Sequence, residues 1–385
     1  MGRIESANRL AMRMWPGHDL SVRRPFQGQA GGLPDTMIDK TLCELPDGRL
    51  VTCWNLHNES GAGVSVLDFG ATLCSVKVPD RGGTLDEVTL GHDRLSDYWH
   101  GRHYLGPVIG RYANRLAGSV FNLDGQRYNL PSNDGPNTLH GGPDGFDRRL
   151  WAGATIDTPD GEGLRLSLQS PHGDQGFPGN LDVSISFVWT EDNRLITDFA
   201  ATSDRPTPLN LTLHGYWNLS AADGGNGLAD HLLELAARSY LPVDRAGIPT
   251  GEIAVVEATP FDFRLPRNLG ESMQAKQEQP GCEAGYDHCW GIEGAGLRRA
   301  AVLYHPQSGR ELTIETDQPG IQVYTANHFD SNVSGRGGRL CVRHSAIALE
   351  TQGFPNAPNQ PGFPATILRP GQSWHSRTIY TFRVR

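Results

Sequence analysis

A buried carboxylate that could act as a general base lies near the C-terminal end of the chain. The segment CVRHSAIALETQGFPNAPNQPGFP, at 341–364, contains Glu350. Its neighbours of the same parity are alanines and those of the other parity are Ile347 and Leu349, so a strand here is apolar on both faces and buried. Burial raises a carboxyl pKa toward neutrality, which suits proton transfer. The alternative is a structural Glu paired with an arginine, but a buried carboxylate is rare without a role.

An imidazole with a polar neighbourhood lies in a second segment, NLTLHGYWNLS at 210–220, which alternates apolar and polar residues without a break. A single strand would place its Leu and Trp residues on one face and the Asn, Thr, His, Tyr and Ser residues on the other. An outer strand with its polar face in solvent has the same pattern. The alternative is that His214 and its polar neighbours form the floor of a cleft for a polar ligand.

Polar residues that could hold such a ligand gather in the loop-rich segment 110–151. Asn114 and Arg115 set an amide beside a planar cation, a combination that grips hydroxyls or a carboxylate with fixed geometry. His140 precedes two glycines, where the backbone can approach a ligand closely. An arginine–aspartate brace that holds a long loop explains the same residues, and taken alone they favour that brace.

Three further patterns are weaker. Asp287 lies between aromatic residues in GYDHCW, and Gln322 shares a strand face with Tyr324 in GIQVYTAN. His100 and His103 form an H-x-x-H pair, but without helical spacing such a pair is more often coincidence than a metal site. A glycine-rich phosphate loop, a nucleophile elbow and a dinucleotide fingerprint are absent from the sequence.

Short β-strands must position these candidates. The chain of 385 residues contains 47 Gly and 26 Pro, which separate short segments rich in alternating and β-branched residues. These segments are GVSVLDFGATLCSVKVP (63–79), LRLSLQS (164–170), DVSISFVWT (182–190), LITDFAAT (195–202) and ELTIETDQPGIQVYTAN (311–327). Only LADHLLELAARSYL (228–241) also fits a helical period. The pattern predicts an all-β sandwich or barrel, with one large β-domain after residue 40.

Composition excludes several classes of function. The net charge of −9 argues against a nucleic-acid or membrane-surface partner. The six cysteines form no C-x-x-C pair and are expected to be small, mostly buried thiols of a reducing compartment. The N-terminus lacks the apolar core of a signal peptide, and no apolar run is long enough to span a membrane. We therefore expect a cytoplasmic protein, a monomer or weak dimer, with an N-terminal extension over 1–38 that either packs on the domain or stays disordered.

Five separated segments, taken in order, resemble the aldose 1-epimerases, also called galactose mutarotases. They are GRYANRLAGSVFNLDGQRYNLPSNDGPNTLHGGPDGFDRRLW, NLTLHGYWNL, SYLPVDRAGIPTGEI, QPGIQVYTAN and ALETQGFPNAPNQPGFP. The resemblance runs from about residue 40 to the C-terminus. It implies a domain over 39–385 that is a single large antiparallel β-sandwich with an open, concave sugar cleft, and it makes 228–241 a strand.

The resemblance also implies roles for individual residues. Glu350 would be the general base and His214 the general acid. The positions that match the family's contacts with sugar hydroxyls are Asn114, Arg115, His140, Asp287 and Gln322. The polar face of 210–220 would then line the sugar cleft.

Two residues depart from the family pattern. Leu213 stands where the family usually has Asn, and Asn356 stands where it usually has Asp. Alternation turns the Leu213 side chain away from the cleft. Asn356 removes a charge near the site, which could alter substrate preference or the pKa of Glu350. Neither change touches the expected acid or base.

The implied reaction needs no cofactor and no metal. Interconversion of α and β anomers requires a base that takes the proton from O1 and an acid that protonates the ring oxygen. Rival functions are a sugar-binding sandwich without catalysis, an epimerase of a phosphorylated or otherwise modified hemiacetal, and a glycosidase with Glu350 and Asp287 as its carboxylates. The presence of both Glu350 and His214 argues against the first, and a single Arg115 argues against a phosphosugar.

Overall fold

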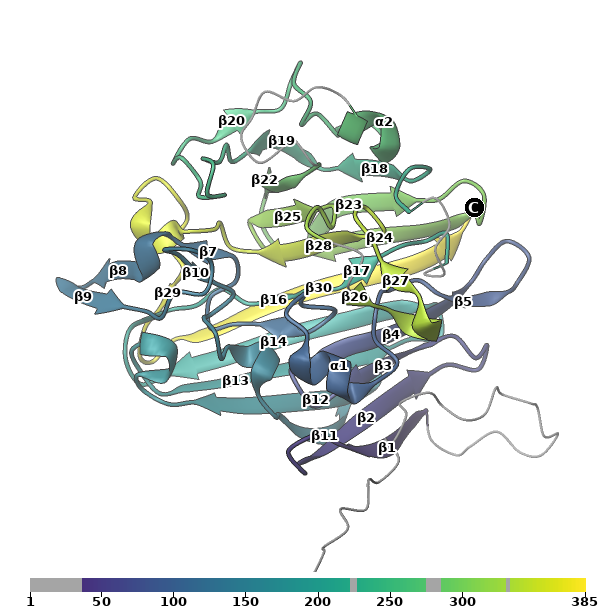
Figure 1. Ribbon diagram of the computed structural model, residues 1–385, viewed down its shortest axis with the longest axis horizontal. Helices are drawn as coiled ribbons and strands as arrows, with labels where there is room; N and C mark the ends of the chain where they lie inside the picture. The colour runs from purple at the N-terminus through teal and green to yellow at the C-terminus, as the bar shows by residue number, and fades with distance from the viewer. Residues whose placement is uncertain (1–36, 222–226, 275–284, 330–332) are drawn as a thin grey trace, which may run out of the picture.

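Three antiparallel sheets build the protein, as the computed structural model shows for residues 37–221, 227–274, 285–329 and 333–385 (Figure 1). The first sheet contains, in spatial order, β1 (Ile38–Glu44), β2 (Leu50–His57), β3 (Gly63–Leu67), β4 (Thr72–Pro79) and β5 (Leu85–Glu87). Its strands follow one another along the chain, because turns rich in Gly, Asp and Asn join each strand to the next.

A nine-stranded sheet forms the largest layer. Its spatial order is β11 (Ala152–Thr158), β12 (Gly161–Ser170), β13 (Leu181–Trp189), β14 (Arg194–Ser203), β30 (Ser373–Val384), β24 (Arg310–Thr316), β23 (Arg298–Tyr304), β18 (Leu232–Leu235) and β21 (Arg267–Asn268). The C-terminal strand β30, yellow in Figure 1, is its central strand and therefore pairs on both edges.

The third sheet has six strands and carries the candidate site. Its order is β17 (Tyr216–Trp217), β28 (Ile347–Gln352), β25 (Gly320–Tyr324), β22 (Asp287–Ile292), β19 (Ala237–Tyr240) and β20 (Ala254–Val255). Five short ladders complete the strand pairing: β6 (Val108–Ile109) with β16 (Thr212–Leu213), β7 (Arg115–Leu116) with β10 (Thr138–Leu139), β8 (Val120–Leu123) with β9 (Gln126–Asn129), β15 (Thr207–Pro208) with β29 (Ile367–Leu368), and β26 (Val333–Ser334) with β27 (Leu340–Cys341). Within the described residues the α-helices are α1 (Leu95–His100) and α2 (Leu269–Gln274).

One apolar core joins the three sheets, which confirms the predicted all-β sandwich. The core takes side chains from every sheet, including Val66 of β3, Ile185 of β13 and Leu349 of β28. Trp217 of the six-stranded sheet packs on Tyr380 of β30, with ring centroids 5.4 Å apart. Aromatic contacts of this kind between facing layers stabilise a sandwich beyond the apolar area that they bury.

The segment 228–241, which also fits a helical period, forms strands as the resemblance implies. β18 belongs to the nine-stranded sheet and β19 to the six-stranded sheet, and Ala236 lies between them. The chain therefore changes layers within this segment. Leu233 and Leu235 are buried in the core while Leu232 and Glu234 are half-buried, which is the alternation of a strand.

The prediction of one continuous strand over 210–220 is wrong. The segment contains two strands of two residues, β16 and β17, which pair with different partners, β6 and β28. Residues 210–219 are all buried, so neither parity faces solvent. Some of the polar side chains bond to the backbone: Asn210 donates to the carbonyls of Ala113 and Gly353, and Asn218 donates to the carbonyl of Ser345. The segment is buried on both sides: Asn210 and Asn218 are satisfied by backbone carbonyls, whereas Thr212 Oγ1 and His214 Nδ1 have no hydrogen-bond partner in the described chain.

Some expectations concern residues at the margins of the description. An N-terminal extension is expected over 1–38. Residues 1–36 of it lie outside the described residues, and β1 begins at Ile38. The five described cysteines are free thiols, three of them buried and two half-buried, as expected. No helix in the described ranges combines the length and apolar character needed to cross a membrane.

Candidate active site

Three of the expected site residues lie together on one face of the six-stranded sheet. β28, β25 and β22 are neighbours, and their register places Gln322 opposite both Glu350 and Cys289. Asp287 lies two residues before Cys289 and so shares that face. The Gln322 Nε2 donates to Asp287 Oδ1 at 2.7 Å. The opposite face of β28 carries Leu349 into the core, so alternation alone turns Glu350 away from the core and toward its polar neighbours.

His214 lies in the two-residue connection between β16 and β17. Its backbone N–H donates to the carbonyl of Pro107 at 3.0 Å, and its own carbonyl accepts from the N–H of Gly106 at 3.0 Å. These two bonds fix the backbone of His214 where the chain leaves one ladder for another. The side chain then reaches Glu350, with Nε2 3.5 Å from Oε1. An acid–base pair from two distant segments is thus formed.

Asn114 and His140 are brought together by the antiparallel pairing of β7 with β10. The N–H of His140 donates to the carbonyl of Asn114 at 3.0 Å, and the N–H of Asn114 donates to His140 Nδ1 at 3.2 Å. Because Nδ1 accepts this bond, a neutral His140 carries its proton on Nε2. Its free nitrogen is therefore a donor, which suits a sugar oxygen better than a metal ion.

Arg115 joins this strand pair to the six-stranded sheet. Its Nε donates to Asp134 Oδ2 at 2.7 Å, and its Nη1 lies 3.6 Å from Asp287 Oδ2. The loop brace considered as an alternative is therefore present, and the same guanidinium also reaches the sheet. Gly247 lies against it: a Cβ there would be 2.9 Å from Arg115 Nη1.

Burial decreases from the centre of the site to its edge. Glu350 is 2% exposed, His214 and Gln322 are each 3% exposed, and His140 is 6% exposed. The Arg115, Asp287 and Asp134 side chains are more exposed, at 15, 20 and 35%. The side nearest solvent is thus the one formed by Arg115 and its two carboxylates.

The central acid–base pair prefers neutral forms. Burial raises the pKa of Glu350 well above its usual value; the Asp287 carboxylate raises it further, and Arg115 opposes this. Burial lowers the pKa of His214 to about 4, against the opposing effects of its own backbone hydrogen bond and of Asp287. Burial, the neighbouring His214 and Arg115 together lower the pKa of His140 well below its usual value. Desolvation is the dominant cause in all three cases. For the pair of His214 and Glu350 it favours a neutral imidazole beside a neutral carboxylic acid, so that the pair shares one acidic proton.

Several polar atoms of the site are buried without a hydrogen-bond partner in the described part of the chain. They are Glu350 Oε2, Gln322 Oε1 and His214 Nδ1. A buried polar atom without a partner costs about 1–3 kcal/mol. Such atoms are expected where a ligand supplies the missing bonds.

A metal ion is one such ligand in principle, because single donor atoms of His140, His214 and Glu350 lie within 4.8 Å of one another. The hydrogen bond from Asn114 to His140 Nδ1 argues against it, since it leaves the proton on the nitrogen that would have to bind the ion. The weaker H-x-x-H pair, His100 and His103, does not belong to this group.

The two departures from the family pattern have separate environments. Leu213 is buried in the core, pairs with Val108 and points away from the site, as expected. Asn356 N–H donates to the carbonyl of Arg115 at 3.0 Å, and its Oδ1 accepts from the N–H of Ala117 at 3.0 Å. Asn356 therefore anchors the strand that carries Arg115. Its expected effect on substrate preference stays a prediction.

Two aromatic residues of the site were not singled out from the sequence. Tyr104 contacts both imidazoles, with ring centroids 4.6 Å from His140 and 5.9 Å from His214. The Tyr216 ring lies 4.9 Å from that of His214. Tyr216 belongs to the alternating 210–220 segment and could have been included, whereas no spacing signal marks Tyr104.

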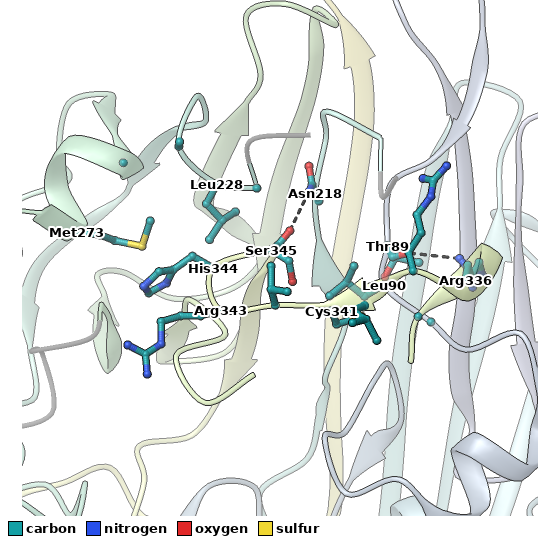
Figure 2. A pocket seen from close by; sticks show the side chains of 18 of the residues that line it. Thr89, Leu90, Asn218, Leu228, Met273, Arg336, Cys341, Arg343, His344 and Ser345 are labelled. Carbon is teal, nitrogen blue, oxygen red and sulfur yellow. Dashed lines mark hydrogen bonds between the residues drawn. The ribbon is translucent and has the colours of Figure 1, made fainter. Parts of the chain in front are cut away.

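A separate cavity of about 440 Å³ lies at the other end of β28 (Figure 2). Leu228, Met273, Arg336, Cys341 and His344 are among the residues that line it. Its described lining contains no carboxylate, so it cannot supply an acid–base pair like Glu350 and His214. The group of polar residues around Glu350, His214 and His140, and not this cavity, is the candidate active site.

Comparison with known proteins shows the family of the chain. A family model described as aldose 1-epimerase matches residues 52–381. The chain is 40% identical to a galactose mutarotase of Bos taurus over 322 residues, 83% of this chain and 91% of the relative, and 38% identical to an aldose 1-epimerase of Haemophilus influenzae, over 90% of this chain and all of the relative. The crystal structure of an aldose epimerase homologue from C. elegans superposes with a TM-score of 0.79 at 32% identity, covering 90% of this chain and 99% of that one. The chain belongs to the aldose 1-epimerase family.

Proposed function

We propose that the protein is an isomerase that interconverts the α and β anomers of a free aldohexose such as galactose or glucose. The observation that carries this proposal is the buried pair of His214 and Glu350, whose Nε2 and Oε1 atoms lie 3.5 Å apart. Family membership supports the reaction, and the relatives that carry the names galactose mutarotase and aldose 1-epimerase support the substrate class.

The reaction moves two protons in opposite directions. Glu350 takes the proton from the O1 hydroxyl while His214 gives a proton to the ring oxygen, and the C1–O5 bond breaks to leave the open-chain aldehyde. Rotation about C1–C2 then presents the other face of the carbonyl. Ring closure reverses the transfers: Glu350 returns a proton to O1, and His214 takes one from the C5 hydroxyl. No net proton is gained or lost by the enzyme.

A pair with one shared proton suits this exchange. Ring opening starts from a carboxylate and an imidazolium and ends with a carboxylic acid and a neutral imidazole. Burial favours the second state, because it raises the pKa of Glu350 and lowers that of His214. The two states differ by one proton moved between groups 3.5 Å apart, so the pair can serve either direction of the reaction.

The remaining residues would orient the sugar. His140, with its proton on Nε2, would donate to a sugar oxygen, and the unpartnered Gln322 Oε1 would accept from a hydroxyl. Asn114, Arg115 and Asp287 would hold the other hydroxyls. Arg115 already lies beside two carboxylates, which leaves little positive charge for a phosphate group and favours an unmodified sugar.

Polarimetry on freshly dissolved α-D-galactose and α-D-glucose tests the proposal. The protein should accelerate the approach to anomeric equilibrium in proportion to its concentration. If neither sugar responds while calorimetry still detects sugar binding, the chain is a sugar-binding module or acts on another hemiacetal. A response only with phosphorylated or modified sugars would favour the second alternative.

A further inference from the structure

Tyr104 contacts both histidines of the site from a segment that the proposed mechanism does not use. It lies between α1 and β6, and its ring centroid is 4.6 Å from that of His140 in an edge-on arrangement. It is 5.9 Å from His214 in a stacked arrangement. His140 and His214 come from different segments, and their own rings are 5.2 Å apart. A single ring therefore touches both imidazoles and can fix their relative orientation.

The segment that carries Tyr104 is itself held against His214. Gly106 N–H donates to the carbonyl of His214 at 3.0 Å, and the Gly106 carbonyl accepts from the N–H of Leu73 at 2.8 Å. A Cβ at Gly106 would collide with the Leu73 carbonyl, so only glycine fits there. The backbone of 104–107 is thus clamped between β4 and the histidine, which makes it a rigid support.

The backbone of Tyr104 is strained. Its φ is 53°, in the left-handed region that bulky residues seldom adopt. Such conformations persist where the surrounding structure requires them, and they concentrate at functional sites. An asparagine would adopt this φ more easily. The presence of an aromatic ring at this position therefore needs an explanation, and the contact with two histidines provides one.

Tyr104 is not simply a core residue. It is half-buried, unlike the fully buried aromatic residues of the core. Burial, and then the Asp147 carboxylate, raise the pKa of its hydroxyl above the usual value, so the phenol stays neutral and does not act as a base. Its contribution to the site comes from the ring.

We propose that Tyr104 is a positioning residue, whose ring holds the imidazoles of His140 and His214 in the orientation that proton transfer requires. This inference rests on the proposed function and adds a residue to its machinery. Without the ring, His214 keeps its backbone bonds and its contact with Tyr216, but its imidazole loses the stacked ring that limits its rotation relative to Glu350 and His140. Loss of the ring should thus slow the chemical step more than it weakens sugar binding.

Three substitutions separate the ring from the hydroxyl and from the backbone. Tyr104→Phe keeps the ring, Tyr104→His keeps an aromatic ring and tolerates the left-handed φ, and Tyr104→Asn tolerates the same φ without an aromatic ring. Tyr128→Asn is the matched control, because Tyr128 is also half-buried and stacks on an aromatic residue, Phe121, in a hairpin away from the site.

We expect Tyr104→Asn to lower kcat about 10- to 100-fold with KM changed less than about threefold, as for a small misplacement of catalytic groups. Tyr104→Phe and Tyr128→Asn should keep kcat within about twofold, and Tyr104→His should fall between. Long-range ¹H–¹⁵N spectra of the imidazole rings give a readout independent of activity. The signals of His140 and His214 should shift or broaden in Tyr104→Asn and stay in place in Tyr104→Phe.

The inference is overturned if Tyr104→Asn keeps both its kcat and its imidazole signals, or if Tyr104→Phe loses as much activity as Tyr104→Asn. A wild-type protein without mutarotase activity would instead contradict the proposed function. In that case the imidazole spectra still decide whether the ring positions the histidines.

Discussion

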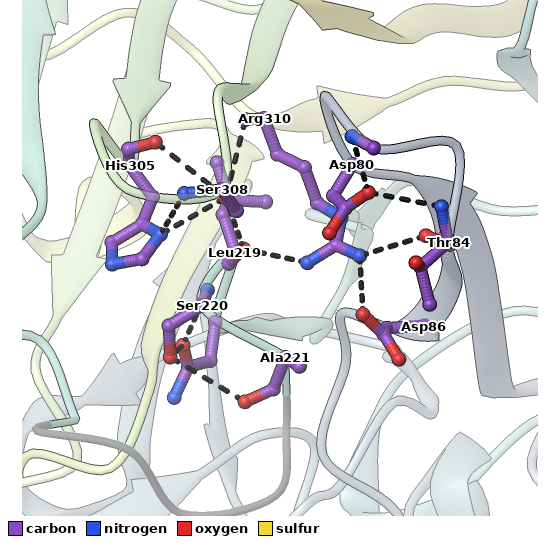
Figure 3. Close-up of polar contacts among 11 residues, drawn as sticks. Asp80, Thr84, Asp86, Leu219, Ser220, Ala221, His305, Ser308 and Arg310 are labelled. Carbon is purple, nitrogen blue, oxygen red and sulfur yellow. Dashed lines mark hydrogen bonds and ion pairs between the residues drawn. The ribbon is translucent and has the colours of Figure 1, made fainter.

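The candidate site and the cluster around Arg310, which Figure 3 shows, bury similar polar groups but use them differently. Arg310 is 2% exposed, and its Nη2 donates to Thr84 O at 3.1 Å and pairs with Asp86 Oδ2 at 2.6 Å. Its Nη1 donates to Leu219 O at 3.2 Å. Arg310 is the first residue of β24. Its side chain therefore joins β24 to the segment that follows β17, to the turn before β5 and to β5 itself.

The neighbours of Arg310 also bond mainly with one another. The Ser308 hydroxyl donates to the same Leu219 carbonyl at 2.9 Å, and the Ser308 N–H donates to His305 Nδ1 at 3.2 Å. His231 Nε2 accepts from the N–H of Leu219 at 2.9 Å. Nearly every bond of the cluster ends on backbone, so the cluster connects segments of the fold.

Both regions leave a buried polar atom without a hydrogen-bond partner in the described chain, and in the cluster around Arg310 one such atom is Arg310 Nε. The site differs because its unpaired atoms belong to the acid–base pair and to the amide beside it. Glu350 Oε2, Gln322 Oε1 and His214 Nδ1 are buried and unpaired, and the Glu350 carboxyl meets an imidazole that prefers to be neutral. Both regions are deeply buried, so burial alone does not mark function. The distinguishing feature is that the side chains of the cluster bond mainly to backbone, whereas those of the site contact one another and leave a carboxyl and an amide oxygen available to a ligand.

Arg310→Met should give the largest loss of stability. It removes the guanidinium, so Asp86 loses its ion pair and the Thr84 and Leu219 carbonyls each lose one of two donors, and the free energy of unfolding should fall by about 3 kcal/mol. Chemical denaturation measures this loss, and the folded fraction should keep its kcat. Arg238→Met is the control, because the Arg238–Glu293 pair is mostly exposed, and its loss should cost less than about 1 kcal/mol. Equal effects of the two substitutions would refute the comparison.

The pH dependence of kcat/KM sharpens the description of the site. As pH falls, His214 gains a proton while Glu350 still holds one, and the pair can no longer accept the O1 proton. Burial lowers the pKa of His214 to about 4. The acidic limb should therefore lie near pH 4 to 5, below the value of about 6.5 for a free imidazole. On the alkaline side the rate falls as pH rises through the raised pKa of Glu350, when the pair loses its last proton.

A pH–rate profile with circular dichroism at each pH tests this prediction. The spectra separate titration of the site from unfolding. An acidic limb near the pKa of an ordinary histidine would show that His214 is not desolvated as the structure indicates.

His231→Gln should give the smallest effect, confined to stability. Burial, and then His305, lower the pKa of His231 to about 3. The unfolded state therefore binds more protons between about pH 3 and 6.5, and stability falls as pH falls through that window. The substitution should remove up to about 2 kcal/mol of the stability lost between about pH 6.5 and 5. Denaturant titrations at several pH values measure the free energy of unfolding, with His375→Gln, at an exposed histidine, as the control. If His231→Gln left the slope of the unfolding free energy against pH unchanged, the prediction would be wrong.

Much of the fold follows from local pattern. The segment 63–79 forms β3 and β4, and 311–327 contains most of β24 and all of β25, because alternation and turn residues are local signals. The prediction of one strand over 210–220 was wrong because the alternation is equally compatible with one strand and with two short ones. Which partners pair with it is decided by distant residues at 108–109 and 347–348. Local sequence carries no information on that choice.

The candidate site was predicted in part from residues and in part from the family resemblance. The burial of Glu350 follows from its apolar neighbours, and the structure places it with His214, His140 and Gln322 in one cluster. The residues alone favoured a loop brace for Arg115, and the structure contains that brace together with the contact to Asp287. Tyr104 could not be predicted from the sequence, because its role depends on tertiary contacts with two histidines that lie far from it in sequence.

The most direct test of the account is the effect of Glu350→Gln on both activity and stability. The amide keeps the shape of the side chain but cannot take the O1 proton, so polarimetry on α-D-galactose should show kcat lowered by about 10²- to 10⁴-fold. The free energy of unfolding should not fall, because a buried ionisable group without a full set of partners is replaced by a neutral one. Glu311→Gln, at a buried carboxylate outside the site, should keep the wild-type kcat. If Glu350→Gln retained wild-type turnover, or lost stability while keeping its rate, Glu350 would be a structural residue and the proposed mechanism would be wrong.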